Sequence, residues 1–223
     1  MLKQLTQAAN YSNQANLIST EDIRDSYLNL AGVDVFYQYS SKTRVGVNYQ
    51  YSQRSFENEG GDSHTHGLAA TLRHYLTSRL YFDVRAGADF ITSFDGGDLT
   101  RPAFSASLTE EIDKLTTGRL EYRQSYSTSS YQSELFQEWR VSGFLTRRLS
   151  ERVGVSASIF YGEGEYSSLN RTDELAGGNI GLTYDIRRDW TGNLQYSYSQ
   201  VESTGDSQSY EKNVVSAGLA ASF

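Results

Sequence analysis

Apolar and polar residues alternate along most of this chain. In residues 190–199, for example, Leu194 and Tyr196 alternate with Asn193 and Gln195. Successive side chains of a β-strand point to opposite faces of a sheet, so the alternation predicts strands that have one apolar and one polar face. We therefore expect an all-β protein.

Turn-forming residues interrupt the alternating segments at regular intervals. Five tight turns recur every 34 to 38 residues, around Lys42, Ser78, Thr116, Ser150 and Arg188. Six polar links lie between the remaining segments, at 18–25, 57–64, 95–100, 129–134, 166–173 and 203–208. These eleven connections predict twelve strands of 11 to 15 residues, each long enough to cross a bilayer at a tilt. A propeller or solenoid of similar period would have four short strands in each repeat.

An even number of strands places both termini on one side of a closed sheet. Bacterial single-chain barrels have even strand numbers and short periplasmic turns. We therefore expect the tight turns in the periplasm and the links outside.

The last strand alternates apolar residues with small or polar ones and ends on Phe223. This ending resembles the C-terminal signature of bacterial outer-membrane β-barrels. The resemblance implies a closed antiparallel up-and-down transmembrane barrel, with residues 1–223 as a single domain. It also implies that the last strand contacts the outer-membrane assembly machinery, with Phe223 as the assembly signal.

The two faces of such a barrel meet different surroundings, with lipid on the apolar side and the lumen on the polar side. The residues that we expect to face the membrane are Val47, Tyr49, Leu120, Tyr122, Val155, Leu194, Tyr196 and Leu219. The charged residues that we expect to line the pore are Asp83, Arg85, Asp89, Glu121, Arg123, Glu138 and Arg140. Their mixed signs leave two interpretations open: a salt-bridge network that braces the barrel, and a transverse field that orients a polar solute.

Composition narrows the class of protein. The mean hydropathy is −0.55, and no apolar run of the length of a membrane helix is present, but a barrel strand needs an apolar residue only at every second position. Seventeen tyrosines suit the rims of a barrel at the membrane interface, and a single proline suits uninterrupted strands. A net charge of −7 argues against a nucleic-acid partner. The first residues lack an apolar segment of the signal-peptide type, so we expect a mature or trimmed chain located in the bacterial outer membrane.

Several segments resemble a known family of barrels. They are the Tyr-x-Tyr-Ser motif, Gln-Tyr-Ser-Tyr-Ser-Gln at 195–200 and Leu-Ser-Glu-Arg-Val-Gly-Val at 149–155, and they are similar to the "putative β-barrel porin 2" group. Some members of that group accompany exopolysaccharide export systems. The strand number also resembles that of small acidic-sugar channels, but their pores are strongly basic, whereas the charges expected in this lumen are balanced. It resembles that of autotransporter translocators as well, but these need a helix ahead of the first strand, and residues 1–20, rich in Asn, Gln and Ser, do not have a helical pattern.

The sequence offers little for catalysis or for metal binding. A barrel hydrolase needs a histidine beside its nucleophile at the outer rim. His74 falls near a tight turn, whereas His64 and His66 fall at a loop edge, where with Asp62 they would make a poor zinc site. We expect no catalytic residue, no metal site and no cofactor.

The pattern as a whole predicts an outer-membrane pore for small hydrophilic solutes or polysaccharide, with the lipid bilayer as its surroundings. The alternatives are a structural barrel whose lumen is occluded by its own side chains and, third, an outer-membrane enzyme.

Overall fold

The structure, a computed structural model, describes residues 5–16, 26–56, 63–92, 98–128, 135–166, 171–187, 189–204 and 209–221. Its strands are β1 (Leu5–Asn16), β2 (Ser26–Gln38), β3 (Thr43–Phe56), β4 (Ser63–Tyr75), β5 (Leu80–Thr92), β6 (Asp98–Glu111), β7 (Thr116–Thr128), β8 (Leu135–Arg148), β9 (Val153–Tyr166), β10 (Arg171–Arg187), β11 (Trp190–Ser203) and β12 (Tyr210–Ala221). Within these ranges, no helix has the length and apolar character needed to span a membrane.

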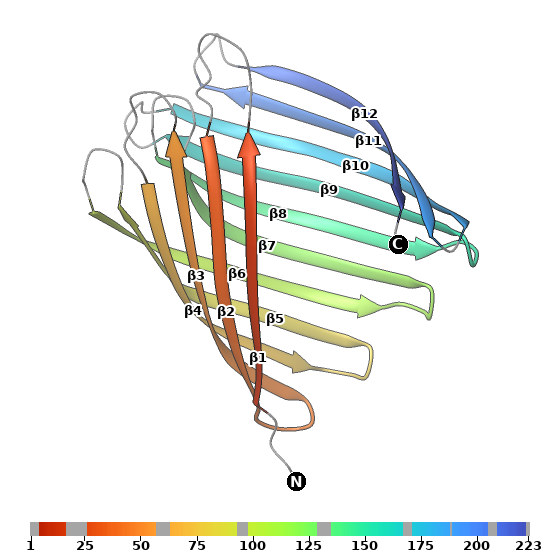
Figure 1. Cartoon of the computed structure of the whole chain (residues 1–223), viewed down its shortest axis with the longest axis horizontal. Helices are drawn as coiled ribbons and strands as arrows, with labels where there is room; N and C mark the ends of the chain where they lie inside the picture. Colours follow the sequence, from red (N-terminus) through yellow and green to blue (C-terminus); the bar gives the residue numbers. More distant parts are fainter. Residues whose placement is uncertain are drawn as a thin grey trace. The chain divides into compact units, whose positions relative to one another are not determined.

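The strands follow one another through the sheet in chain order (Figure 1). The prediction of an all-β protein with antiparallel, up-and-down strands is therefore confirmed. Closure into a twelve-stranded barrel requires β1 to pair with β12, and it stays a prediction.

The chain forms two compact units, which share strands β5 to β8. The first consists of Met1–Tyr75, Asp83–Ala106 and Ser125–Phe136; the second consists of Leu76–Phe82, Ser107–Gln124 and Gln137–Phe223. The expectation of a single domain stays a prediction.

The register of the first unit is regular over β1 to β4. Leu5 pairs with Tyr37, Ser26 with Phe56 and Thr43 with His74, and no shift interrupts these ladders. Since the side-chain period of a strand is two, this register keeps Val45, Val47 and Tyr49 on one face and their polar neighbours on the other.

In the second unit, strands β9 to β12 align their apolar positions in rows. Val155 pairs with Leu182, Leu182 with Leu194 and Leu194 with Ala217. The next row on the same face begins at Ala157. The register thus joins the apolar positions of four strands into one continuous surface.

The tight turns share a local design. At four of them, one side-chain oxygen accepts hydrogen bonds from backbone N–H groups two or three residues later, namely at Ser40, Thr77, Asp113 and Ser150. Such side chains complete a turn by replacing missing backbone partners. The N–H of Leu115 holds the pKa of the Asp113 carboxyl below its ordinary value.

One predicted turn is displaced. Thr116, expected within a turn, begins β7, and the turn occupies residues 112–115. The Thr116 hydroxyl instead donates to Asp113 Oδ2 at 3.0 Å, which closes the turn from the strand side.

Three predicted links are shorter than expected, because their last residues belong to strands. Ser63 and His64 lie in β4, and residues 98–100 lie in β6. Residues 171–173 pair with 164–166 of β9, so β10 has 17 residues and exceeds the expected 11 to 15. Near its other end a β-bulge between Asp185 and Arg187 adds a residue to β10.

The buried residues lie mainly on the polar face. Among the described residues, the buried apolar ones are Ala69, Ile91, Ala103 and Val201, and no large side chain is fully buried. Many large apolar side chains are exposed, such as Val47, Ile159 and Ile180. A water-soluble sheet buries its apolar face, so this inverted arrangement is typical of a sheet that is surrounded by lipid.

Candidate functional site

A chain of hydrogen bonds crosses the polar face of the first unit. Asn48 of β3 donates from Nδ2 to Oδ1 of Asp34 on β2 at 2.8 Å, and Nη2 of Arg85 on β5 donates to Asn48 Oδ1 at 2.8 Å. Arg85 must therefore reach across β4, which carries small residues at Gly67 and Ala69. The side-chain amide of Asn48 thus links β2, β3 and β5.

Gly67 makes room for this arrangement. A Cβ atom at Gly67 would lie 2.7 Å from Asp89 Oδ1 and 3.8 Å from Arg85 Nη2. Any larger residue would displace the Asp89 carboxylate, so the glycine places both charged side chains against the wall.

A second pair on the same face joins β4 to β5. Arg73 Nε donates to Asp83 Oδ1 at 2.6 Å and Arg73 Nη2 donates to Asp83 Oδ2 at 3.0 Å. Both side chains are about one-third exposed, so the pair contributes modestly to stability while fixing the geometry of both groups.

In the second unit, an arginine lies flat against the wall. Arg140 Nε is 2.7 Å from Glu138 Oε1, and the guanidinium carbon lies 4.4 Å from the ring centre of Phe160. The Phe160 ring in turn occupies the space beside Gly177, where a Cβ atom would approach it to 2.7 Å. The carboxylate and the ring together hold Arg140 close to the sheet.

We expect Gly177→Ala to destabilise the protein by about 1–2 kcal/mol, because the new methyl group would lie 2.5 Å from the Tyr198 carbonyl oxygen and 2.7 Å from the Phe160 ring, so the backbone or the ring would have to shift. Gly192→Ala is the matched control, since its nearest neighbour would lie 3.6 Å away. Urea unfolding of both variants in vesicles measures the difference. Equal stabilities would show that both the Tyr198 carbonyl and the Phe160 ring can make room for the methyl group at no cost.

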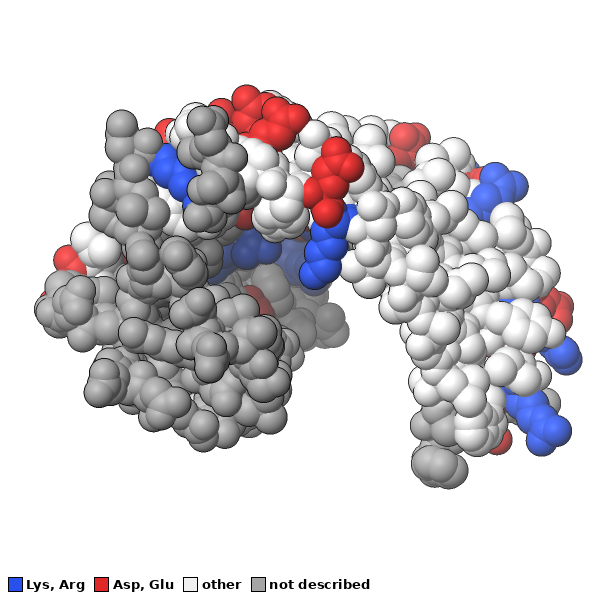
Figure 2. All heavy atoms as spheres, turned by 90° about the horizontal axis from the view of Figure 1, so that it is seen from above, with Lys and Arg blue, Asp and Glu red and all other residues white. Residues whose placement is uncertain are grey.

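Charges of opposite sign alternate across this face. Arg119 pairs with Glu121 at 2.5 Å on β7, and Arg123 is exposed two positions further along. Figure 2, which colours the charged residues over one side of the molecule, shows basic and acidic side chains scattered among larger areas of uncharged residues. The observed contacts pair some of these charges, and both interpretations of them, as a bracing network and as a transverse field across a pore, stay predictions.

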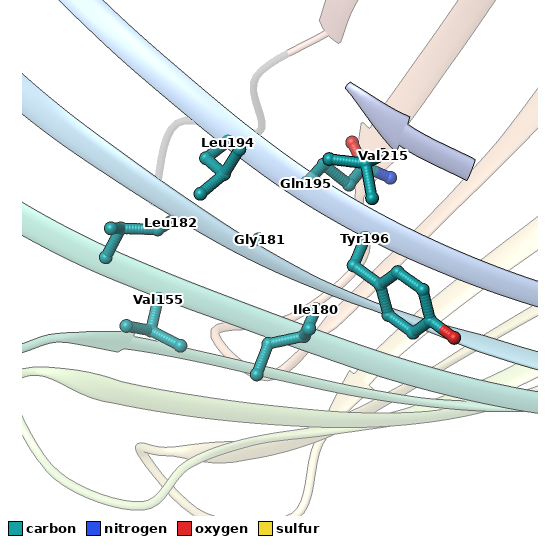
Figure 3. A pocket seen from close by; sticks show the side chains of 8 residues that line it. All are labelled: Val155, Ile180, Gly181, Leu182, Leu194, Gln195, Tyr196 and Val215. Atoms are coloured by element: carbon teal, nitrogen blue, oxygen red, sulfur yellow. The ribbon is translucent and has the colours of Figure 1, made fainter. Parts of the chain in front are cut away.

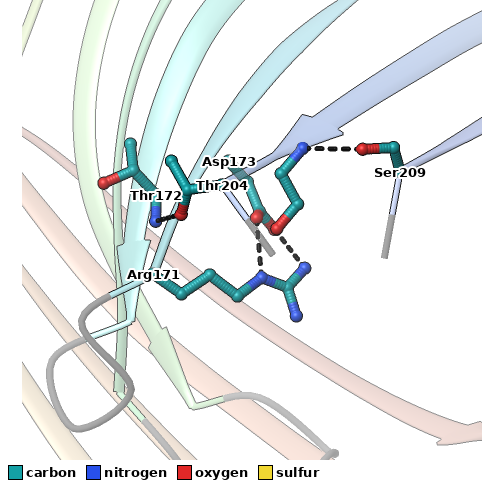
Figure 4. Close-up of polar contacts among 6 residues, drawn as sticks. Arg171, Thr172, Asp173, Thr204 and Ser209 are labelled. Carbon is teal, nitrogen blue, oxygen red and sulfur yellow. Dashed lines mark hydrogen bonds and ion pairs between the residues drawn. The ribbon is translucent and has the colours of Figure 1, made fainter. Parts of the chain in front are cut away.

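The sequence pattern missed a buried ion pair at the link end of β10. Arg171 donates from Nε and Nη2 to the two carboxylate oxygens of Asp173, both at 2.7 Å (Figure 4). Asp173 is 3% exposed, and the Arg171 guanidinium lies 4.8 Å from the ring centre of Tyr166. Both charged residues were assigned to a solvated link, although period two already places them on one face.

Hydrogen bonds tie this ion pair to the neighbouring hairpin. The Thr172 N–H donates to Thr204 Oγ1 at 3.2 Å, and the Thr204 N–H donates back to the Thr172 carbonyl at 3.0 Å. Ser203 N–H donates to Ser209 Oγ at 3.0 Å (Figure 4). The cluster therefore connects the start of β10 to the end of β11 and to the residue before β12.

The opposite face carries the residues that we expect to meet lipid. Six of the eight are exposed, namely Val47, Tyr49, Leu120, Leu194, Tyr196 and Leu219, while Tyr122 and Val155 are half-buried. In the second unit a shallow groove of ≈ 300 Å³ lies between two apolar rows of β9 to β12 (Figure 3). Its walls include Val155, Ile180 and Tyr196.

The two histidines of β4 lie near the link end of that strand and share one of its faces, as expected, although His64 belongs to the strand and not to the link. His66 Nδ1 is 2.8 Å from the Tyr49 hydroxyl, and His64 Nδ1 is 2.8 Å from the Tyr51 hydroxyl. The strand continues to Ser63 because Arg54 of β3 pairs with that residue. Asp62, the third candidate ligand, lies outside the described residues, and the part that is described holds no cluster of three metal-ligating side chains.

The predicted pore-lining residues fall into separate sets. Asp83, Arg85 and Asp89 alternate along β5 and join the contacts of the first unit. Glu138 and Arg140 form one pair of the second unit. Phe223 lies outside the described residues, so its role as assembly signal stays a prediction.

Comparison with known proteins points to one family. Residues 97–223 match the family model described as "Putative beta-barrel porin 2". No protein with a curated description matches the chain.

Several solved structures share the fold at 10% sequence identity. The FrpB iron transporter of Neisseria meningitidis has a TM-score of 0.56, over 90% of this chain and 41% of that chain. An outer-membrane channel from Pseudomonas putida F1 has a TM-score of 0.52, over 98% of this chain and 95% of that one. A loop-deletion variant of OmpT, an outer-membrane protein of Vibrio cholerae, has a TM-score of 0.51, over 98% and 99%. The chain thus spans about two fifths of the length of FrpB.

Proposed function

The chain belongs to the putative beta-barrel porin 2 family, and from that premise we propose that it is a passive outer-membrane channel for small hydrophilic solutes. Its structural neighbours include an outer-membrane channel and an outer-membrane protein, which supports a location in the bacterial outer membrane and a general role in transport. The same proposal includes polysaccharide as an alternative cargo, and we propose that the channel is not an enzyme.

The division of each sheet segment into two faces is the observation that carries the proposal. Large apolar side chains are exposed on one face, and paired charges with small polar residues cover the other. The apolar face can contact lipid without leaving a polar group unpaired. The polar groups of the other face, in contrast, need hydrogen bonds to water or to one another. A hydrated lumen meets that need.

Closure completes the proposed channel. An open sheet edge within hydrocarbon would leave backbone groups without partners, each at a cost of several kcal/mol. We propose that β1 pairs with β12 to close a twelve-stranded barrel, with the tight turns in the periplasm, and that Phe223 engages the assembly machinery.

Conductance in a planar lipid bilayer tests this function. The folded chain is expected to give discrete single-channel steps. Silent insertion, with the barrel shown to be folded by its resistance to protease, would favour the alternative of an occluded structural barrel.

Replacing Arg85 with glutamine tests which face lines the lumen. The change removes one cation from the polar face, so reversal potentials in a salt gradient should shift toward cation selectivity. Arg147→Gln is the control, because Arg147 shares the outward face of Val141 and Leu145 on β8. An equal shift in both variants would refute the assigned faces.

A further inference from the structure

The polar face of β9 to β12 differs chemically from that of β2 to β5. On β2 to β5, every strand carries charge on its polar face: Asp34 on β2, Arg44 on β3, Arg73 on β4, and Asp83, Arg85 and Asp89 on β5. The middle of β9 to β12 carries amides, hydroxyls and glycines on the same type of face.

The register brings the uncharged groups of four strands together. Asn193 of β11 pairs with Thr183 of β10 and with Gly218 of β12. In the next row, Gln195 pairs with Gly181 and with Ser216.

A third row contains a direct amide to hydroxyl contact. Asn179 pairs with Ser158 in the register, and Asn179 Nδ2 donates to Ser158 Oγ at 2.7 Å. We call the set of Ser156, Asn179, Thr183, Asn193, Gln195 and Ser216 the neutral strip.

Glycines let the polar side chains of the neutral strip lie along the wall. A Cβ atom at Gly181 would come within 2.8 Å of Ser156 Oγ, and one at Gly218 would collide with Asn193 Oδ1. Ser156, Thr183, Asn193, Gln195 and Ser216 are nevertheless exposed. Their side chains are therefore accessible to a solute, and the contact already made by one of them, from Gln195 Nε2 to Ser197 Oγ at 3.3 Å, is itself exposed.

A second feature marks one end of the neutral strip. In the row beyond Asn179, Phe160 pairs with Gly177, and the guanidinium of Arg140 covers the Phe160 ring. A planar array of N–H donors thus adjoins the amides.

We infer that the neutral strip binds uncharged, polyhydroxylated solutes, of which saccharides are the common class. This inference rests on the proposed channel function, since the strip must face a hydrated lumen. Hydroxyl and carboxamide groups both donate and accept hydrogen bonds, so they can match solute hydroxyls in either direction. The net free energy gained per hydrogen bond is small when a solute hydroxyl exchanges water for such a partner. A solute is therefore bound weakly and can dissociate and pass through the channel.

Charged solutes gain less binding free energy from the neutral strip than neutral solutes do. An ion that gives up part of its hydration needs an opposite charge in exchange, and none of the six residues of the neutral strip provides one. The charge of Arg140, which adjoins the strip, is already paired with that of Glu138. The strip therefore favours neutral over charged solutes of equal size.

Single-channel recording with two probes of one length tests the inference on the unaltered protein. The probes are maltohexaose, a neutral glucose hexamer, and the hexamer of galacturonic acid, whose carboxylates are ionised at neutral pH. Maltohexaose should interrupt the current at a concentration about fivefold to tenfold lower than the acidic hexamer. Equal potency, or stronger block by the acidic hexamer, would overturn the inference and leave the channel function intact.

A pair of isosteric variants locates the effect. Gln195→Glu places a charge within the neutral strip, and the concentration of maltohexaose for half-block should rise about fivefold. Gln200→Glu makes the same change on the opposite face of β11, beside Tyr198, and should leave the block unchanged. Because it also replaces the hydrogen bond from Gln200 Nε2 to Glu202 by a like-charge contact, resistance to protease confirms that this variant is folded. Equal block in Gln195→Glu and the unaltered channel would overturn the assignment to this strip. Absence of current in the unaltered, folded protein would instead refute the channel function itself.

Discussion

Replacing Ile159 with arginine is expected to destabilise the membrane-inserted protein by about 2–4 kcal/mol. Ile159 lies in the middle of β9 and is 72% exposed on the apolar face, where an arginine would meet the centre of the bilayer. Unfolding by urea from lipid vesicles measures the loss.

Two further variants on β9 check the reason for this effect. Val155→Arg lies on the same face but nearer the tight turn, so its cost should be smaller, because the penalty falls toward the interface. Ser156→Arg points to the polar face and should have a mild effect. Equal costs at Ile159 and Ser156 would refute the face assignment of this strand.

Replacing Asp173 with alanine is expected to cost about 3 kcal/mol of unfolding free energy, because it leaves the Arg171 guanidinium buried without its carboxylate. The side chain of Arg171 is only 15% exposed, so water replaces the lost partner poorly. The midpoint of urea unfolding reports the change.

Glu174→Gln is the matched control for that experiment. Glu174 is exposed and lies opposite Glu163 and Glu202, so neutralising it relieves repulsion and should not reduce stability. The double variant Arg171→Met with Asp173→Leu should be more stable than Asp173→Ala, because it removes both charges. A double variant as unstable as Asp173→Ala would mean that hydrogen bonds to the neighbouring hairpin, and not the loss of the ion pair between Arg171 and Asp173, determine the loss of stability.

The alternation of residue types was enough to predict the strands and their faces. Every second residue of a strand faces the same way, so the side of Leu194 or Gln195 follows from position alone. Turn residues likewise predicted the connections, because Ser40, Thr77 and Ser150 act on backbone groups only two or three residues away. Local chemistry of this kind needs no knowledge of the rest of the chain.

Strand ends were predicted less well, because pairing with a neighbouring strand decides them. His64 and Asp173 stand in polar segments that favour a link, yet each belongs to a strand that pairs with an extended neighbour. A hydrogen bond at a strand end needs a partner on the neighbouring strand, which is distant in sequence. A local sequence pattern therefore cannot predict whether that hydrogen bond forms.

The sequence by itself determined the secondary structure, the apolar and polar faces and the family, since all three depend on the order of residues along single strands. Only the tertiary structure decided which side chains meet: Arg85 with Asn48, Phe160 with Gly177 and the uncharged rows of β9 to β12. The physical reason is register, because the contacts between strands depend on how far each is displaced along its neighbour.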